Sequence, residues 1–224
     1  MKLSIIVPVF NEAGTIISFL EPLQRLRERG HELIIVDGGS NDETPVLAKP
    51  LSDKCVTAKK GRAAQMNLGA LVASGEVYMF LHADTLLPVN SDNFVEKAMV
   101  KTKRKWGRFN IKLSGKGITL RLIGWLMNLR SRLTGIATGD QCIFVEAETF
   151  KQIGGFKNIP LMEDIAFSKA LKKVSRPICL KQKALTSSRR WEQYGVWRTI
   201  FLMWKLRWAY FRGVDPKKLA AKYH

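Results

Sequence analysis

The first part of the chain alternates dense apolar runs with stretches whose apolar residues recur at helical spacing. Residues 3–10 (LSIIVPVF) are almost wholly apolar, as in a strand buried on both faces of a parallel sheet. Apolar side chains then recur every three to four positions over 13–29, and Gly30 closes this predicted helix as a C-terminal cap. A second apolar run, ELIIVD at 32–37, completes a β-α-β unit, which implies a right-handed parallel crossover.

The same alternation continues to residue 82 and predicts an α/β fold. It predicts a helix that Pro45 begins, a strand near 54–58, a helix over 61–74 that Gly75 caps, and a strand at 76–82. A doubly wound, Rossmann-like and mostly parallel sheet flanked by helices accounts for this pattern most simply.

Beyond residue 90 the alternation is looser. It predicts helices over 91–103, 118–133, 163–173 and 194–212, and strands over 106–113 and 142–145. No internal repeat, low-complexity tract or linker forces a domain boundary. With 224 residues, of which 46% are hydrophobic, the chain is expected to fold as one α/β domain with a small appendage.

Polar residues follow three of the predicted parallel strands, at the point where each strand ends. These clusters are Asn11-Glu12, Asp37-Gly38-Gly39-Ser40 and His82-Ala83-Asp84. In such sheets ligands bind beyond the carboxyl ends of the strands. The sequence therefore predicts one binding crevice lined by all three clusters.

The segment VDGGSNDET at 36–44 has two interpretations. Asp37 and the polar residues after it suit a turn that caps the next helix. Alternatively, the glycines let a nucleotide approach the backbone while Asp37 accepts hydrogen bonds from its base or ribose. A dinucleotide-binding fold or a methyltransferase would carry its glycines after the first strand, where Phe10-Asn11-Glu12 stand instead, so both classes are disfavoured.

Two further acidic positions each have a structural and a chemical interpretation. Asp84 is either a turn residue or, beside a pyrophosphate, a ligand of Mg²⁺ or Mn²⁺, ions that take carboxylate and phosphate oxygens. Glu163 and Asp164 open a predicted helix. Either they stabilise its dipole, by about 0.3–1 kcal/mol, or one of them deprotonates a hydroxyl nucleophile.

The charge of the chain predicts an anionic partner. Its 37 Lys and Arg outnumber 19 Asp and Glu, a net charge of +18, which suits nucleic acid, phospholipid headgroups or a phosphorylated substrate. Half of this excess lies in residues 181–224, where 11 Lys and Arg face 2 Asp and Glu, a net +9. Three widely spaced cysteines argue against a disulfide framework or a CxxC metal site and favour a reducing cytoplasm. The amino terminus is interpreted as a strand, not a signal peptide, and no membrane-spanning helix is expected.

Residues 194–212 (YGVWRTIFLMWKLRWAYFR) predict a basic, aromatic, amphipathic helix. Arg198, Lys205 and Arg212 are seven residues apart and so lie near one stripe, with aromatic residues in the neighbouring turns. Such a helix suits a membrane interface, where indole rings settle and cations meet anionic lipids. The alternative is a helix packed on its own domain, and no recognised motif supports nucleic-acid binding.

Eight short motifs, in order and spacing, resemble family 2 glycosyltransferases with the GT-A fold. The motifs are VPVFNE (7–12), VDGGSNDET (36–44), KGRAAQMNLGA (60–70), FLHADT (80–85), TGDQ (138–141), GGF (154–156), MED (162–164) and SRRW (188–191). The likeness covers the chain to about residue 191. It is most similar to the short bacterial branch described as transferase 2, rSAM/selenodomain-associated.

The resemblance implies a fold, an activity and roles for the donor side of the crevice. Residues 1–191 would form the GT-A domain, with 192–224 as a basic aromatic helix and tail. The activity would be an inverting, hexosyltransferase-type transfer from a nucleotide-diphosphate sugar, with a UDP-sugar favoured, to a hydroxyl acceptor. The nucleotide would be bound by Pro8, Glu12, Asp37, Gly38, Arg62 and Asp84. Asp84 would also hold Mg²⁺ or Mn²⁺.

On the acceptor side, the resemblance implies that Asp164 is the general base, with Glu163 beside it. Gly139, Asp140 and Gln141 would surround the acceptor. Arg189, Arg190 and Trp191 would lie by the acceptor and the departing diphosphate, where arginine offers a bidentate geometry that lysine lacks. The basic helix adds the expectation of a lipid-linked acceptor and of a protein peripheral to the inner face of the plasma membrane.

Two positions depart from the family pattern. The metal motif reads His82-Ala83-Asp84 and so lacks its first acidic residue, which leaves one protein carboxylate for the metal. Gly38 stands where many relatives have a second aspartate, and this bears on the preferred base. Two other functions stay open: a nucleotidyltransferase that makes a sugar nucleotide, and a non-catalytic basic membrane-binding module with a decayed donor site.

Overall fold

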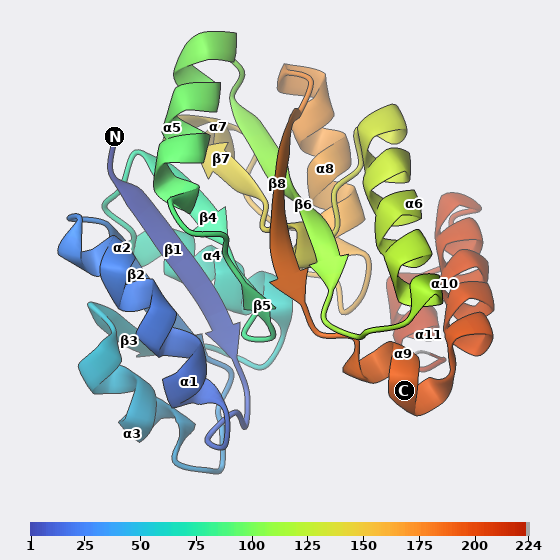
Figure 1. Cartoon of the computed structure of the whole chain (residues 1–224), viewed down its shortest axis with the longest axis horizontal. Coiled ribbons are helices and arrows are strands. Elements are labelled where there is room, and N and C mark those ends of the chain that lie inside the picture. The colour runs from blue at the N-terminus through green and yellow to red at the C-terminus, as the bar shows by residue number, and fades with distance from the viewer. Residues whose placement is uncertain (223–224) are drawn as a thin grey trace.

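A single mixed sheet organises the protein and sets the position of the crevice (Figure 1). The computed structural model describes residues 1–222, with the side chain of Arg190 excepted. Within them the strand order is β3-β2-β1-β4-β7-β6-β8-β5. The strands are β1 (Leu3–Val9), β2 (Glu32–Asp37), β3 (Lys54–Thr57), β4 (Val77–Phe80), β5 (Thr85–Leu86), β6 (Trp106–Leu113), β7 (Phe144–Glu146) and β8 (Ile178–Thr186).

Helices cover both faces of this sheet. They are α1 (Ile16–Leu20), α2 (Gln24–Glu28), α3 (Thr44–Ala48), α4 (Arg62–Val72), α5 (Ser91–Thr102), α6 (Ile118–Thr134), α7 (Ala147–Gln152), α8 (Glu163–Val174), α9 (Arg189–Tyr194), α10 (Val196–Phe211) and α11 (Pro216–Ala220). Three 3₁₀ turns, η1 (Glu21–Leu23), η2 (Lys49–Leu51) and η3 (Gly139–Gln141), complete the described elements.

The amino-terminal half is the parallel, doubly wound unit that the sequence predicts. Strands β3, β2, β1 and β4 all run parallel. All six residues of β2 are buried, because helices cover it on both sides. Side chains of β1 alternate between two cores: Leu3, Ile5 and Val7 face α1 and α5, and Ile6 faces α4.

The carboxyl-terminal half is mixed, although four of the seven strand pairings in the described sheet are parallel, as predicted for a mostly parallel sheet. Strand β7 runs antiparallel to both β4 and β6. Strand β8 runs parallel to β6 and antiparallel to the two-residue β5. The apolar pattern of these short strands is the same for either direction, which is why the sequence did not reveal it.

Several predicted helices end or break at different residues. The helix predicted over 13–29 is divided into α1, η1 and α2 around Pro22, and the helix over 194–212 is divided at Gly195 (φ +81°). Helix α4 ends at Val72, so Gly75 is not its cap; a side chain there would meet Ser4 at 2.7 Å. Strand β4 ends at Phe80, which leaves His82 in the following loop. The pattern did not reveal β5, β8, α7, α9 or α11.

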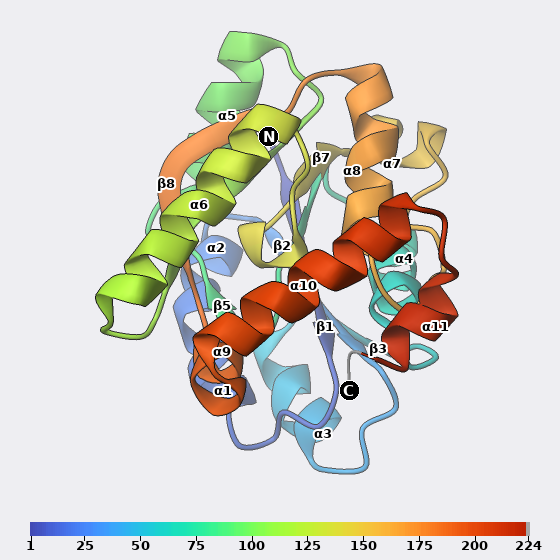
Figure 2. The same ribbon diagram turned by 90° about the vertical axis from the view of Figure 1, so that its right-hand side faces the viewer.

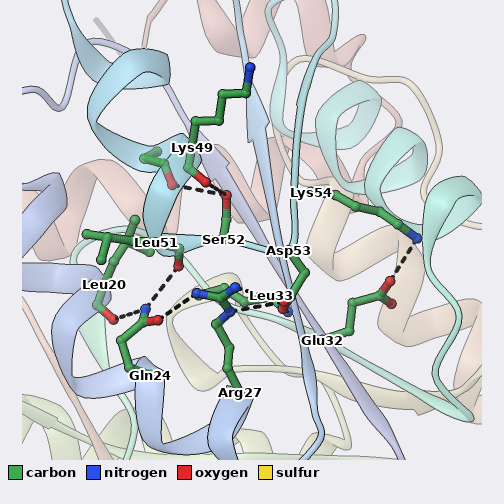
Figure 3. A network of polar contacts seen from close by, with 11 residues as sticks. Leu20, Gln24, Arg27, Glu32, Leu33, Lys49, Leu51, Ser52, Asp53 and Lys54 are labelled. Carbon is green, nitrogen blue, oxygen red and sulfur yellow. Dashed lines mark hydrogen bonds and ion pairs between the residues drawn. The ribbon is translucent and has the colours of Figure 1, made fainter.

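A polar network fixes α2 against the far edge of the sheet, away from the carboxyl ends of the strands (Figure 3). One oxygen of Asp53 accepts from Arg27 Nε and Nη2 at 3.1 and 2.9 Å, and the other accepts from the backbone N–H of Leu33 at 2.7 Å. Gln24 Nε2 donates to the carbonyls of Leu20 and Leu51. These contacts fix the connection between β2 and β3, and their role is to stabilise the fold.

The C-terminal helices pack on the domain, which is the alternative that the sequence left open for them. Leu206 of α10 and Leu219 of α11 are buried against Met162 and Ile165 at the start of α8. Figure 2 shows α10 crossing the face of the molecule diagonally, from α9 below α6 toward α8 and α11. Among the described residues, no helix is long and apolar enough to span a membrane. Cys55, Cys142 and Cys179 are unpaired.

Candidate functional site

The turn after β2 uses both oxygens of Asp37. Oδ2 accepts from the backbone N–H groups of Gly39 and Ser40, each at 2.9 Å, and Oδ1 accepts from the Ser40 hydroxyl. Asp37 is only 2% exposed and its carboxylate is bonded within the turn, so Asp37 shapes the turn as the first interpretation predicts. Its contact with a nucleoside stays a prediction.

The loops after β1 and β2 are joined to each other. The backbone N–H of Asn11 donates to Ser40 Oγ at 2.8 Å, and that of Glu12 donates to Thr44 Oγ1 at 2.7 Å. Asp42 Oδ1 accepts from the N–H of Thr44, the first residue of α3, although Glu43 and not Asp42 holds the N-cap position. Glu12 therefore lies beside the Asp37 turn, at one end of the crevice.

A buried glutamine that the motifs did not single out supports the same turn. Gln65 of α4 donates through Nε2 to the carbonyls of Val9 and Val36, at 2.8 and 2.7 Å. A β-carbon at Gly38 would lie 3.1 Å from that nitrogen, tighter than ordinary contact. Gly38 thus lets the turn pack on Gln65, which gives a structural reason for glycine at this position.

The loop after β4 carries His82 inward and Asp84 outward. His82 is 8% exposed and packs on Gly139, where a β-carbon would overlap its ring. Burial, followed by repulsion from Arg62, lowers the pKa of His82 to about 4, so its ring is neutral near pH 7. Asp84 is exposed to the crevice, with Thr85 Oγ1 3.1 Å from its Oδ1.

Pairing of β5 with β8 brings two motifs together that are a hundred residues apart. Thr85 Oγ1 donates to Thr186 Oγ1 at 3.0 Å, and the N–H of Ser187 donates to the carbonyl of Asp84 at 3.0 Å. Arg189, the first residue of α9, is exposed. It lies two residues after Ser187, which makes the contact with Asp84.

The rest of the SRRW motif has a different environment. Trp191 packs against Leu113, Leu120 and Ile123 and so joins α9 to β6 and α6. The side chain of Arg190 lies outside the described residues. The roles assigned to these residues by resemblance stay predictions.

At the opposite end of the crevice, the start of α8 presents Glu163 and Asp164. Asp164 Oδ2 accepts from the N–H of Gly139 at 3.1 Å, which ties α8 to η3, and its Oδ1 accepts from the N–H of Ile165 at 2.7 Å. Met162 holds a left-handed conformation (φ +69°) immediately before the helix. Seven residues from five of the motifs line one small pocket here: Met66, Phe80, His82, Gly139, Phe156, Glu163 and Asp164.

The carboxylates of this pocket repel one another. Desolvation by the surrounding protein, followed by the charge of Asp84, raises the pKa of Asp140 to about 6. The side chain nevertheless keeps 42% of its surface exposed to solvent. Burial, followed by the charge of Asp164, raises the pKa of Glu163 to about 7. Arg62, at the first turn of α4, opposes both shifts. Its charge therefore acts in the middle of the crevice.

Glu163 should make the stability of the protein fall as the pH rises. Its folded pKa of about 7 exceeds the ordinary 4.5, so its contribution is complete below pH 4.5 and lost as the pH passes 7. Relative to Glu163→Gln, the wild type should lose about 3 kcal/mol of unfolding free energy across that window. Urea unfolding of both proteins at several pH values measures this. The exposed Glu148→Gln should follow the wild type, and parallel curves for wild type and Glu163→Gln would contradict the assignment.

The residues fit a divalent cation with few protein ligands. In the part of the chain that the structure describes, no three His, Cys, Asp or Glu side chains gather as a metal site. Asp84 nevertheless faces Asp140 closely enough to raise its pKa, a repulsion that a cation between them would relieve. One or two carboxylates together with diphosphate oxygens are a donor set that Mg²⁺ and Mn²⁺ accept.

Comparison with known sequences finds a family model and several relatives. Residues 4–101 match the model of "Glycosyl transferase family 2". The match covers 98 of the 224 residues, so the chain is similar to this family over its amino-terminal part. A "PGL/p-HBAD biosynthesis glycosyltransferase" of Mycobacterium tuberculosis is 34% identical over 91 residues, and the match covers 38% of this chain and 36% of that protein. The same values hold for a protein of that description in Mycobacterium bovis. The chain thus spans about a third of the length of these curated relatives.

Solved structures show that the chain has the GT-A fold, as predicted. S. aureus TarS in complex with UDP superposes with a TM-score of 0.68 at 19% identity, covering 84% of this chain and 60% of that one. The mannosyltransferase PcManGT from Pyrobaculum calidifontis, in complex with GDP-Man and Mn²⁺, gives 0.60 at 18% identity, covering 82% and 56%. Glucosyl-3-phosphoglycerate synthase from Mycobacterium tuberculosis, with Mn²⁺ and UDP, gives 0.58 at 17% identity, covering 81% and 70%.

Proposed function

We propose that the protein is an inverting glycosyltransferase that moves a sugar from a nucleotide-diphosphate sugar to a hydroxyl group. The observation that carries this proposal is the arrangement of Asp84 and Asp164 at one crevice, around a pocket that His82, Gly139 and Glu163 complete. The family match and relatives named as glycosyltransferases support it.

The donor occupies the end of the crevice formed by the loops after β1 and β2. Asp37, Gly38 and Glu12 lie there, and Pro8 is half-buried at the end of β1. Arg62 stands between this end and the acidic pocket, where its charge meets the diphosphate. We favour a UDP-sugar, because similar structures hold UDP and UDP-GlcNAc.

Asp164 acts as the general base. Two backbone N–H groups, from Gly139 and Ile165, hold its carboxylate in one orientation at the pocket wall. An acceptor hydroxyl bound beside Gly139, Asp140 and Gln141 gives its proton to Asp164 while its oxygen attacks the anomeric carbon. The bond to the nucleoside diphosphate breaks on the opposite face, so the anomeric configuration inverts. Glu163, with its raised pKa, stays largely protonated below neutral pH and leaves Asp164 as the carboxylate that accepts the proton.

Negative charge develops on the leaving diphosphate, and cationic groups at the crevice would stabilise it. Arg189 follows two residues after Ser187, whose N–H binds the Asp84 carbonyl, and its planar guanidinium can donate paired hydrogen bonds to phosphate oxygens. Asp84 would hold a divalent metal, which when bound neutralises charge on the diphosphate.

Calorimetric titration with UDP and with GDP, each with and without Mn²⁺, tests the donor site. We expect Mn²⁺-dependent binding of UDP, and release of free UDP from a UDP-sugar when a hydroxyl acceptor is supplied. Binding of neither nucleotide under any condition would refute the proposal and leave a non-catalytic, basic binding module. Incorporation of a nucleoside triphosphate and a sugar phosphate into a sugar nucleotide would instead identify a nucleotidyltransferase.

We further propose that the outward face of α10 binds an anionic membrane surface, at the cytoplasmic side of the plasma membrane. Its large aromatic residues are each 59–68% exposed: Trp197, Phe201, Trp204, Trp208 and Phe211. Exposed apolar residues of α6, including Trp125, lie on the adjacent helix, which packs against α10 through Ile200 (Figure 2). Arg212 lies over the Trp208 ring at 5.0 Å, so cations and indoles share this face.

Replacing two of these indoles should weaken membrane binding without affecting the fold. We expect Trp204→Glu/Trp208→Glu to lower co-sedimentation with phosphatidylglycerol vesicles by about tenfold, because it removes apolar area and adds repulsion. Leu71→Glu, at an equally exposed apolar residue of α4, is the matched control and should bind as the wild type does. No binding of the wild type at low salt would exclude a membrane role for this face.

A further inference from the structure

Two arginines in the C-terminal part of the chain lie close enough to Asp164 and Asp140 to interact with them electrostatically, and no motif included them. Arg130 is on α6 and Arg207 is on α10. Nε and Nη2 of Arg130 and Nε of Arg207 are buried and have no hydrogen-bond partner among the described residues. A buried donor left without an acceptor is costly, so this arrangement points to a bound group with acceptor oxygens.

The fold places both side chains beside the proposed base. On α6, Asn128 lies 3.5 Å from the Gln141 amide, which brings this part of the helix to η3. On α10, Leu206 is buried against Met162 and Ile165, on either side of Glu163 and Asp164. Arg130 and Arg207 each interact electrostatically with Asp164 and Asp140.

The cations also crowd one another. Burial, followed by repulsion from Arg207, lowers the pKa of Arg130 to about 10, and Arg108 of β6 adds to that repulsion. Arg108 is fully buried, and its Nε has no partner among the described residues either. Arg130 is thus repelled by both Arg207 and Arg108, and an anion beside it would relieve this repulsion.

The position distinguishes this cluster from the donor-binding end. Pro8, Glu12 and Asp37 follow β1 and β2, whereas α6 and α10 lie at the other side of the sheet, beyond β6 and β8 (Figure 1). A ligand held by Arg130 and Arg207 therefore lies on the side of Asp164 where an acceptor approaches.

We infer that Arg130 and Arg207 form an anion site for a phosphate group of the acceptor, so that the enzyme glycosylates a hydroxyl on a phosphorylated molecule. This inference rests on the proposed function for the meaning of acceptor, but the site binds phosphate whether or not transfer occurs. Planar guanidinium groups match the oxygens of phosphate with paired hydrogen bonds. The phosphate can belong to a soluble ester or to a lipid headgroup.

Titration with inorganic phosphate, in the presence of saturating UDP and Mg²⁺, tests the site with the donor end already filled. We expect Arg207→Gln and Arg130→Gln to weaken phosphate binding by about tenfold or more, as loss of a charged hydrogen bond predicts. UDP affinity should stay unchanged. Arg198→Gln, at an exposed arginine of α10, is the matched control and should leave both affinities unaltered. Arg207→Lys and Arg130→Lys keep the charge without the fork and serve if the glutamine variants fail to fold.

The outcomes separate this inference from the proposed function. The anion site would be overturned if the wild type bound UDP but not phosphate, or if all variants had the same phosphate affinity. Both arginines would then be counter-charges of Asp140 and Asp164. Loss of UDP affinity in Arg207→Gln would assign the pair to the donor diphosphate instead. Phosphate binding without UDP binding would refute the proposed function alone. Arg207-dependent binding to vesicles with phosphatidic acid, above that to phosphatidylglycerol vesicles, would identify a lipid source; dependence with free phosphate only would identify a soluble one.

Discussion

Asp164→Asn is expected to lower the rate of sugar transfer by about 100-fold or more, the usual contribution of a general base. The amide can still accept the hydrogen bond from the N–H of Gly139, so the start of α8 should keep its place. It cannot take the proton of an acceptor hydroxyl. UDP affinity, measured by calorimetry, should remain within about twofold of the wild type because Asp164 lies at the acceptor side.

The neighbouring carboxyl supplies the comparison. Glu163→Gln should retain most of the transfer activity, because Glu163 is buried and largely protonated below its raised pKa of about 7. If Glu163→Gln abolishes transfer while Asp164→Asn does not, the two assignments must be exchanged. Loss of UDP affinity in Asp164→Asn would mean that the pocket as a whole had been disturbed.

Asp84→Ala should remove the metal dependence of donor binding. Asp84 is the exposed carboxylate in the loop after β4, and its charge acts on Asp140. Without it, a divalent ion beside the diphosphate loses its carboxylate ligand, and Mn²⁺-dependent UDP affinity should fall by about 100-fold, equivalent to several kcal/mol of charge stabilisation. Titration with UDP at fixed Mn²⁺ measures the change.

Two controls make this result specific. Glu28→Ala removes an exposed acid of α2, far from the crevice, and should leave UDP binding unchanged. Asp84→Ala should also lower the raised pKa of Asp140, because Asp84 contributes to it. Equal UDP affinity with and without Mn²⁺ in the wild type would show that Asp84 holds no metal needed for donor binding.

The C-terminal helix shows how far a helical pattern can be interpreted. Its period predicts an amphipathic helix, and α10 has that form. The period does not show which side packs inward. Leu206 is buried on the domain and Arg207 meets the acidic pocket, whereas Trp204 and Trp208 point to solvent. Packing on the domain and the proposed binding to a membrane are therefore compatible, because they involve different faces of the helix.

The sequence by itself determined the parallel half of the sheet and the clusters at its carboxyl ends. Buried parallel strands must be nearly continuous apolar runs, and ligand-binding residues must follow them, so both leave a local signal in residues such as Asp37 and Asp84. Its motifs also indicated the family whose model matches residues 4–101.

Only the tertiary structure decided which distant residues meet. The β5–β8 pair places Ser187 against Asp84, Gln65 supports the Gly38 turn, and α6 and α10 bring Arg130 and Arg207 to Asp164. No local sequence pattern predicts these contacts, because each joins elements that are tens of residues apart in the chain. They depend on sheet order and helix packing, which arise when the whole apolar core is buried at once.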